Sequence, residues 1–128
     1  MITILQCQDP TCFDDDLQKA TEMAKHQGAD LFLIALAERS TETGVSWCPD
    51  CQVAYPSIMA ALMQRESPSV LLELTVQRSS YKNNPSYPYR KHEKLHLKAV
   101  PQLFRLSDWR TLIEDECKDF QKVRDFVK

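Results

Sequence analysis

The chain has 128 residues, of which 43% are hydrophobic and 27% charged, and its formal net charge at pH 7 is −2. This length and composition suit one soluble domain, so we expect residues 1–128 to form a single folded unit. The longest apolar run, Leu31–Ala37, is far shorter than the ~20 residues that span a bilayer, which argues against a membrane protein. The slightly acidic balance argues against a nucleic-acid binder that works by neutralising phosphates.

The first third of the chain predicts a strand, a helix and a second strand. The first strand is expected at Ile2–Leu5. The acids Asp14–Asp16 favour the start of a helix because they complement the positive end of its dipole, and Gly28 is a natural helix stop. Leu31–Ala37 is apolar without alternation, which is typical of a strand covered on both faces.

The middle of the chain predicts a second helix and a second buried strand. Apolar residues recur at helical spacing from Val53 to Met63. The β-rich segment Val70–Val76 predicts a central strand. A long polar and aromatic connection follows at Gln77–Pro88, and a short helix is expected at Tyr89–Leu95.

The C-terminal third predicts a hairpin and a closing helix. The segments Gln102–Leu106 and Trp109–Ile113 are expected to pair across a turn at Ser107 and Asp108. Asp115–Val127 places apolar residues on one face of a helix. The resulting order, β-α-β-α-β-α-β-β-α, predicts an α/β fold in which a central mixed sheet is flanked by helices on both faces.

The five cysteines indicate a compartment and a motif. An odd number, after an N-terminus without the basic and apolar regions of a secretory signal, indicates a reducing compartment, and we expect a cytoplasmic protein. Cys48 and Cys51 form a C-x-x-C motif between a predicted strand and a predicted helix, which is the context of a redox-active pair. We expect the other three, Cys7, Cys12 and Cys117, to be packed apolar residues.

The motif Trp47-Cys48-Pro49-Asp50-Cys51 places a cysteine at the N-terminus of a helix. Unpaired backbone N–H groups and the helix dipole favour the thiolate there, and Pro49 suits the first turn because its missing N–H is not needed. Cys48 is therefore expected to be the nucleophile, and Cys51, one turn further in, to resolve the mixed disulfide. Trp47 would form an apolar shelf beside the sulfur.

A structural zinc site is an alternative use of the same pair, with further ligands from Cys7, Cys12, His92 and His96. The chain has no second C-x-x-C motif, and these ligands are scattered along it. Structural zinc sites usually show tightly paired ligands. We therefore predict that no metal is bound.

The segment Ser46–Cys51 resembles the active-site motif of the thioredoxin domain-containing protein 17 family, and it differs from the Trp-Cys-Gly-Pro-Cys of thioredoxin itself. The resemblance covers most of the chain. Further matches are Ala54 and Pro56 after the motif, Tyr81, Pro85 and Arg90 in the long connection, Ala99–Pro101 before the hairpin, and Leu112, Glu114, Glu116 and Cys117 near the C-terminus.

This resemblance implies a thioredoxin fold and a cytosolic disulfide reductase, a monomer that binds no cofactor. Its partners would be thioredoxin reductase, which supplies electrons from NADPH, and protein disulfides or small disulfides such as cystine. Val100 and Pro101 match a segment whose peptide bond is cis in thioredoxin folds; it would lie beside Cys48, exclude metal ligation and offer the Val100 backbone to an extended substrate. Pro56 would kink the helix.

Three features depart from the family. Gln102 stands where the family has Thr, which could change the groove that meets the substrate. The loop Glu38–Val45 keeps a single glycine, Gly44. The strand Leu31–Ala37 has no acid, whereas thioredoxin itself has a buried Asp on this strand that helps to move a proton.

The sequence leaves two possible roles open for Asp50 and two for a group of three tyrosines. Asp50 either accepts a proton from Cys51 or stabilises the helix N-terminus, and its charge opposes thiolate formation at Cys48. Three tyrosines form either a substrate-discriminating surface or an ordinary surface loop: Tyr81, Tyr87 and Tyr89.

The sequence therefore favours a thiol–disulfide oxidoreductase that works through Cys48 and Cys51. A rival function, from another class, is a thioredoxin-fold binding or signalling adaptor that uses the same face without turnover.

Overall fold

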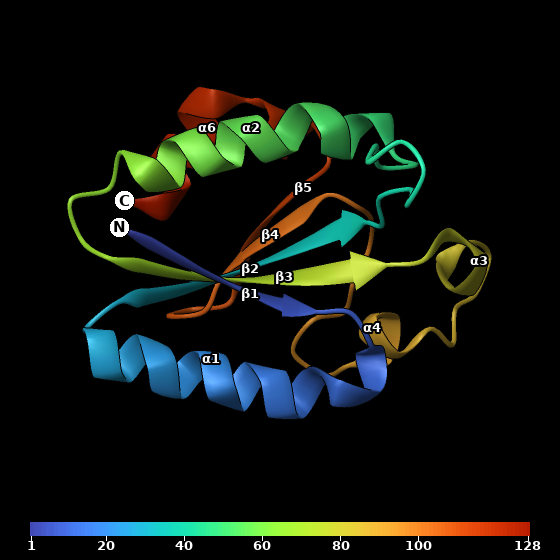
Figure 1. Ribbon diagram of the computed structural model, residues 1–128, viewed down its shortest axis with the longest axis horizontal. Helices are drawn as coiled ribbons and strands as arrows, with labels where there is room; N and C mark the ends of the chain where they lie inside the picture. Colours follow the sequence, from blue (N-terminus) through green and yellow to red (C-terminus); the bar gives the residue numbers. More distant parts are fainter.

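A computed structural model describes residues 1–128, and its ribbon is drawn in Figure 1. The strands are β1 (Ile2–Cys7), β2 (Asp30–Ala37), β3 (Ser69–Val76), β4 (Gln102–Arg105) and β5 (Arg110–Ile113). The helices are η1 (Pro10–Cys12, a 3-10 turn), α1 (Phe13–Gln27), α2 (Pro49–Met63), α3 (Arg78–Tyr81), α4 (Pro88–Lys91), α5 (Asp115–Lys118) and α6 (Phe120–Val127).

The five strands form one mixed sheet in the order β1-β3-β2-β4-β5. β1, β3 and β2 are parallel, and β4 and β5 add an antiparallel hairpin next to β2. Helix α1 covers one face, and α2 with α6 covers the other (Figure 1). The predicted α/β fold with helices on both faces of a mixed sheet is confirmed.

The core consists of two apolar layers, one on each face of the central strands. Because side chains alternate along a strand, Leu33 and Leu72 pack in the α1 layer, whereas Phe32, Ile34 and Leu71 pack in the layer under α2 and α6. All five are at most 1% exposed. This two-sided burial explains why Leu31–Ala37 shows an unbroken apolar run.

Several predicted elements keep their places. Gly28 adopts the left-handed conformation, with φ of 63°, and its N–H binds the last turn of α1. Pro56 lies inside α2 without ending it. The strand at the N-terminus runs two residues beyond the predicted Leu5, to Cys7, and the connection after β3 contains the extra short helix α3.

Two predicted helices are wrong in extent. The helix expected at Tyr89–Leu95 ends at Lys91, because His92 is extended and the chain then turns to bury Leu95 and Leu97. The closing helix is split in two at Asp119. The Asp119 backbone is extended, and its carboxylate accepts hydrogen bonds from the N–H groups of Gln121 and Lys122, so it caps α6 instead of continuing α5.

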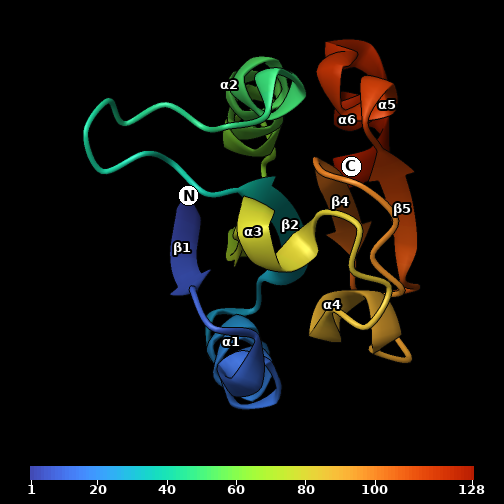
Figure 2. The same cartoon turned by 90° about the vertical axis from the view of Figure 1, so that its right-hand side faces the viewer.

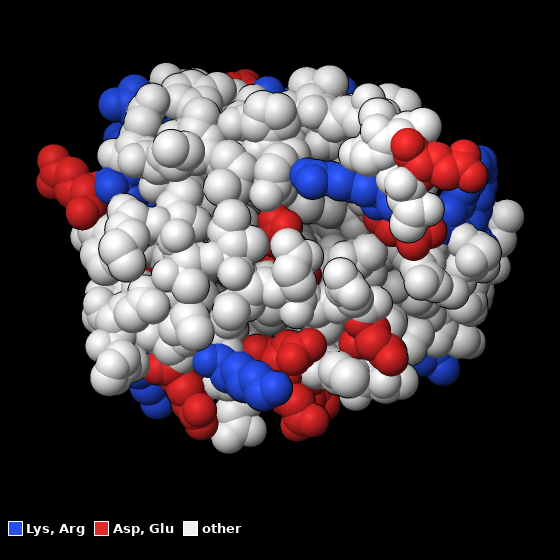
Figure 3. Space-filling model, viewed as in Figure 1, with Lys and Arg blue, Asp and Glu red and all other residues white.

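Charges of both signs are interspersed on the face seen in Figure 3, without a continuous field of one sign. None of the helices combines the length and the apolar character that crossing a bilayer requires.

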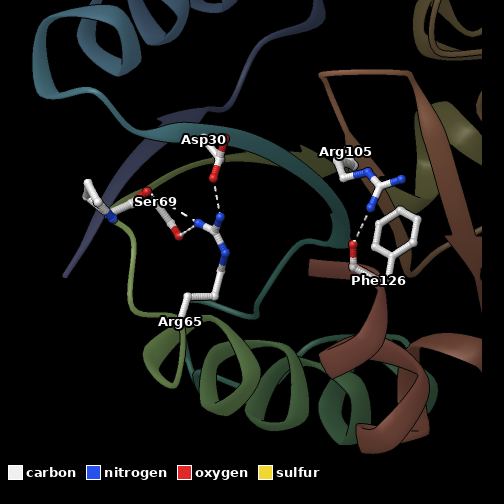
Figure 4. A network of polar contacts seen from close by, with 6 residues as sticks. Asp30, Arg65, Ser69, Arg105 and Phe126 are labelled. Carbon is white, nitrogen blue, oxygen red and sulfur yellow. Dashed lines mark hydrogen bonds and ion pairs between the residues drawn. The ribbon is translucent and has the colours of Figure 1, made fainter. Parts of the chain in front are cut away.

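The end of α2 is tied to the sheet by Arg65, shown in Figure 4. Its guanidinium donates hydrogen bonds to Ser69 Oγ (2.5 Å) and Pro68 O (3.3 Å), and it forms an ion pair with Asp30. The Arg65 side chain is only 8% exposed, and Ser69 is fully buried. The guanidinium therefore satisfies the buried Ser69 hydroxyl at the start of β3 and pairs with the exposed Asp30 carboxylate at the start of β2.

We expect Arg65→Met to lower the free energy of unfolding by about 2–3 kcal/mol, because it keeps the apolar stem but removes charge-assisted hydrogen bonds and leaves a buried hydroxyl unpaired. Urea denaturation of both proteins measures the difference. Arg110→Met, at an exposed position of β5, is the matched control. Equal and small effects of the two substitutions would contradict this role.

Candidate dithiol site

The C-x-x-C motif lies at the edge of the sheet where β1, β3 and β2 end. Figure 2 looks onto this edge: the first turn of α2 lies at the top, α3 in the centre and α5 beside α2. Cys48 is the N-cap residue of α2, Pro49 is its first residue, and Cys51 follows one turn later. The expected position of the motif at a helix N-terminus is thus confirmed.

Cys48 lies against the segment that precedes β4. Its exposed fraction is 9%, and its Sγ donates a hydrogen bond to Val100 O at 3.6 Å. The Val100–Pro101 peptide bond is cis. The structure therefore brings together Cys48, Val100 and Pro101 as the resemblance implied.

Cys51 is the inner thiol of the pair. It is 2% exposed, and its Sγ accepts a hydrogen bond from the Ala37 N–H at 3.5 Å. Burial is the main cause that raises the pKa of the Cys51 thiol well above its ordinary value, and the nearby charge of Asp50 acts in the same direction. Cys51 must therefore lose its proton to another group before it can attack a disulfide.

Residues on both sides of the motif hold the first turn of α2 in place. Trp47 packs against the core, and its indole N–H donates to Val76 O at 3.1 Å. The Ser46 hydroxyl donates to Ala37 O (3.1 Å) and accepts from the Cys48 N–H (3.3 Å). The role of Ser46 was not predicted, although a serine just before a helix start is a recognisable capping signal.

Asp50 is held by an ion pair. Its Oδ1 lies 3.1 Å from Nζ of Lys118, which comes from α5. Lys118 also binds Asp115 Oδ1 at 2.7 Å, and these two hydrogen bonds raise the pKa of the lysine. Lys118 was missed because no local pattern joins residues 68 positions apart.

A buried acid lies near the site. It is on β3, whereas the buried Asp of thioredoxin lies on the strand that corresponds to Leu31–Ala37. Glu73 of β3 is 7% exposed and accepts hydrogen bonds from the Tyr55 hydroxyl (2.8 Å) and Gln6 Nε2 (3.0 Å). Burial, together with the bond to Glu73, raises the pKa of Tyr55 to about 12. Tyr55 and Cys51 line the same cleft of about 300 Å³.

Gln102 does not line an open groove. Its side chain is buried, with Oε1 accepting from the Lys98 N–H and Nε2 donating to Thr111 Oγ1, both at 3.0 Å. The Gln102 side chain, which stands where the family has Thr, therefore connects the segment before Pro101 to β5.

The other three cysteines differ from one another. Cys7 is fully buried, shares a hydrogen bond with the Tyr89 hydroxyl (3.3 Å), and burial raises its pKa to about 11. Cys117 is also fully buried, and burial raises its pKa to about 12. The expectation that Cys12 is packed in the core is wrong: it is exposed, because it lies at the end of the surface turn η1.

The ligands that a zinc site would need are not brought together. No group of three or more His, Cys, Asp or Glu side chains has an arrangement suited to a metal ion. His92 instead lies 3.1 Å from Asp14, and Cys7 contacts Tyr89.

The three tyrosines of the long connection do not form a common surface. Tyr87 and Tyr89 are 3% and 1% exposed, so the interpretation of these two as surface residues is wrong. The ring centroids of Tyr81 and Trp47 are 6.2 Å apart. The Arg90 guanidinium stacks on Tyr81, with its Cζ 3.9 Å from the ring centroid. Only Tyr81 thus borders the dithiol edge.

The model of the thioredoxin domain of the thioredoxin domain-containing protein 17-like family matches residues 11–128. Thioredoxin domain-containing protein 17 of Mus musculus is 32% identical over 103 residues, which cover 80% of each chain. The thioredoxin-like protein Clot of Oryza sativa subsp. japonica is 35% identical over 83 residues, which cover 62% of this chain and 60% of that protein.

The chain is also similar to part of a longer protein. Acireductone dioxygenase of Leishmania braziliensis is 38% identical over 114 residues, which cover 82% of this chain but 33% of that protein. The chain thus spans about a third of the length of this relative.

We expect iodoacetamide at pH 8 to modify Cys12 and Cys48 in the native protein and to spare Cys7 and Cys117. Burial blocks the reagent at the two spared thiols, and their raised pKa keeps them protonated at this pH. Mass spectrometry of the digested protein, before and after denaturation, measures this. Modification of Cys7 or Cys117 as fast as Cys12 would contradict the buried placement.

Proposed function

The chain belongs to the thioredoxin domain-containing protein 17-like family, and we propose that it is a cytosolic disulfide reductase that works through Cys48 and Cys51. Family membership supports a thioredoxin-fold redox protein. The substrates in this proposal are protein disulfides or small disulfides such as cystine.

One observation carries the proposal: two thiols of unequal exposure lie one turn apart at the N-terminus of α2. The outer one, Cys48, contacts Val100 O beside the cis peptide bond. The inner one, Cys51, is nearly inaccessible and receives a hydrogen bond from Ala37. This arrangement suits an outer nucleophile and an inner resolving thiol.

The reaction proceeds in two exchanges. The Cys48 thiolate attacks one sulfur of the substrate disulfide, forms a mixed disulfide and releases the other sulfur as a thiolate. Cys51 then loses its proton to water and attacks the Cys48 sulfur, which releases the second substrate sulfur as a thiolate. Each substrate thiolate takes up one proton from water, which balances the two protons that the dithiol loses. The protein dithiol becomes the Cys48–Cys51 disulfide, and two electrons pass to the substrate.

The disulfide form must be reduced before the next turnover. In this proposal thioredoxin reductase supplies the two electrons from NADPH, and the protein binds no cofactor of its own. The hydrogen bond from Ala37 N–H to Cys51 Sγ stabilises the inner sulfur as negative charge develops on it.

We expect Cys48→Ser to abolish the reduction of cystine or insulin in an assay coupled to thioredoxin reductase and NADPH. A serine hydroxyl is not a nucleophile toward disulfides at neutral pH, because it is not ionised. Cys51→Ser should instead trap mixed disulfides through Cys48, which non-reducing electrophoresis detects. Cys12→Ser, at the exposed thiol outside the site, is the control and should retain turnover.

Continued turnover of Cys48→Ser would contradict the mechanism. If the parent protein reduced neither substrate, and partner binding persisted after both cysteines were replaced by Ser, the result would favour the adaptor function over the reductase.

A further inference from the structure

We propose that Lys118 is a positioning residue of the dithiol site, which holds the Asp50 carboxylate and offsets its negative charge beside the two thiols. The inference rests on the proposed dithiol function, since it concerns the charge balance at Cys48 and Cys51. The observation behind it is the ion pair of 3.1 Å between Lys118 Nζ and Asp50 Oδ1, which links α5 to the first turn of α2.

Asp50 creates an electrostatic problem for the site. It lies between the two cysteines, and its carboxylate disfavours a second negative charge on either sulfur. The N-terminus of α2 acts in the opposite direction, because its dipole and free N–H groups favour the thiolate. A cation bound to the carboxylate reduces the repulsion, while Asp50 keeps its favourable position in the first turn of α2.

Helix α5, which carries Lys118, is held firmly against the rest of the domain. Its neighbour Cys117 is fully buried, with Sγ 3.2 Å from Leu112 O. Just before α5, the Glu114 N–H donates to Pro101 O at 2.8 Å. The helix that carries Lys118 is therefore attached to the same cis segment that Cys48 contacts, so the lysine has a defined position relative to the thiols.

The Lys118 ammonium forms ion pairs with two carboxylates, those of Asp50 and Asp115. Asp115 shares Lys118 with Asp50, at 2.7 Å, whereas the Glu116 carboxylate is engaged with the Ile113 N–H at 3.1 Å. The Lys118 side chain is 31% exposed, so solvent screens the interaction only in part. Lys118 is thus shared between two carboxylates, and of these only Asp50 lies in the first turn of α2, next to the two cysteines.

The ion pair also bears on the two interpretations of Asp50. The Asp50 carboxylate already accepts a hydrogen bond from Lys118 Nζ at 3.1 Å, which links the first turn of α2 to α5. The pairing with Lys118 therefore favours the structural role of Asp50 at the helix N-terminus over a role as the base for Cys51.

The test is the rate of Cys48 alkylation by iodoacetamide against pH, in a Cys12→Ser background so that a single accessible thiol reacts. We expect Lys118→Met to lower the rate at pH 7 about threefold and to move the midpoint of the profile to higher pH, because the Asp50 carboxylate then loses the ammonium that holds it and offsets its charge. Lys118→Arg should restore most of the rate. Lys122→Met, which removes the same charge on α6, is the matched control and should leave the profile in place.

The double variant separates this electrostatic role from a structural one. In an Asp50→Asn background we expect Lys118→Met to change the rate by less than about 1.5-fold, because the lysine then has no carboxylate to hold beside the thiols. An unchanged profile in Lys118→Met, or an equal loss with and without the Asp50 carboxylate, would overturn the proposal. If the parent protein reduced no disulfide but the profile still shifted as expected, the reductase function would fail while the role of Lys118 would stand.

Discussion

The dithiol site depends on the burial of β2 and β3 in the middle of the sheet. Both strands are covered on both faces and pair in parallel, so the chain leaves them at the same edge, with Ala37 and Val76 in register. The backbone at these two ends then holds the motif: Ala37 N–H binds Cys51 Sγ, and Val76 O binds the Trp47 indole. A shift of register would separate the inner thiol from its hydrogen-bond donor.

The second support comes from the other end of the chain. The cis segment is contacted on one side by Cys48, through Val100 O, and on the other by Glu114, through Pro101 O. The helix that follows Glu114 brings Lys118 to Asp50. The C-terminal segment from Val100 to Lys118 therefore supplies both the backbone that Cys48 contacts and the partner of Asp50. The matched family region, residues 11–128, contains all of these parts.

The prediction from sequence succeeded where local pattern and burial agree. The apolar run of β2, the stop at Gly28 and the helix start at Pro49 are short-range signals, and the structure contains each of them. It failed where burial overrides local pattern. Tyr87 looked like a surface residue because its neighbours are polar, yet its ring fills the core, and Cys12 looked like a packed thiol, yet it lies on an exposed turn.

The sequence by itself determined the central strands, the long helices α1 and α2 and the place of the C-x-x-C pair, because strand burial, helix capping and the C-x-x-C spacing are all properties of neighbouring residues. The tertiary structure alone decided the surroundings of that pair. It pairs Lys118 with Asp50 and brings the buried acid Glu73 of β3 to the Tyr55 hydroxyl. It also gives the Cys51 sulfur a hydrogen-bond donor, the Ala37 N–H. These contacts join residues that are far apart in the chain, and their geometry exists only once the helices pack on the sheet. For that reason no local pattern could have revealed them.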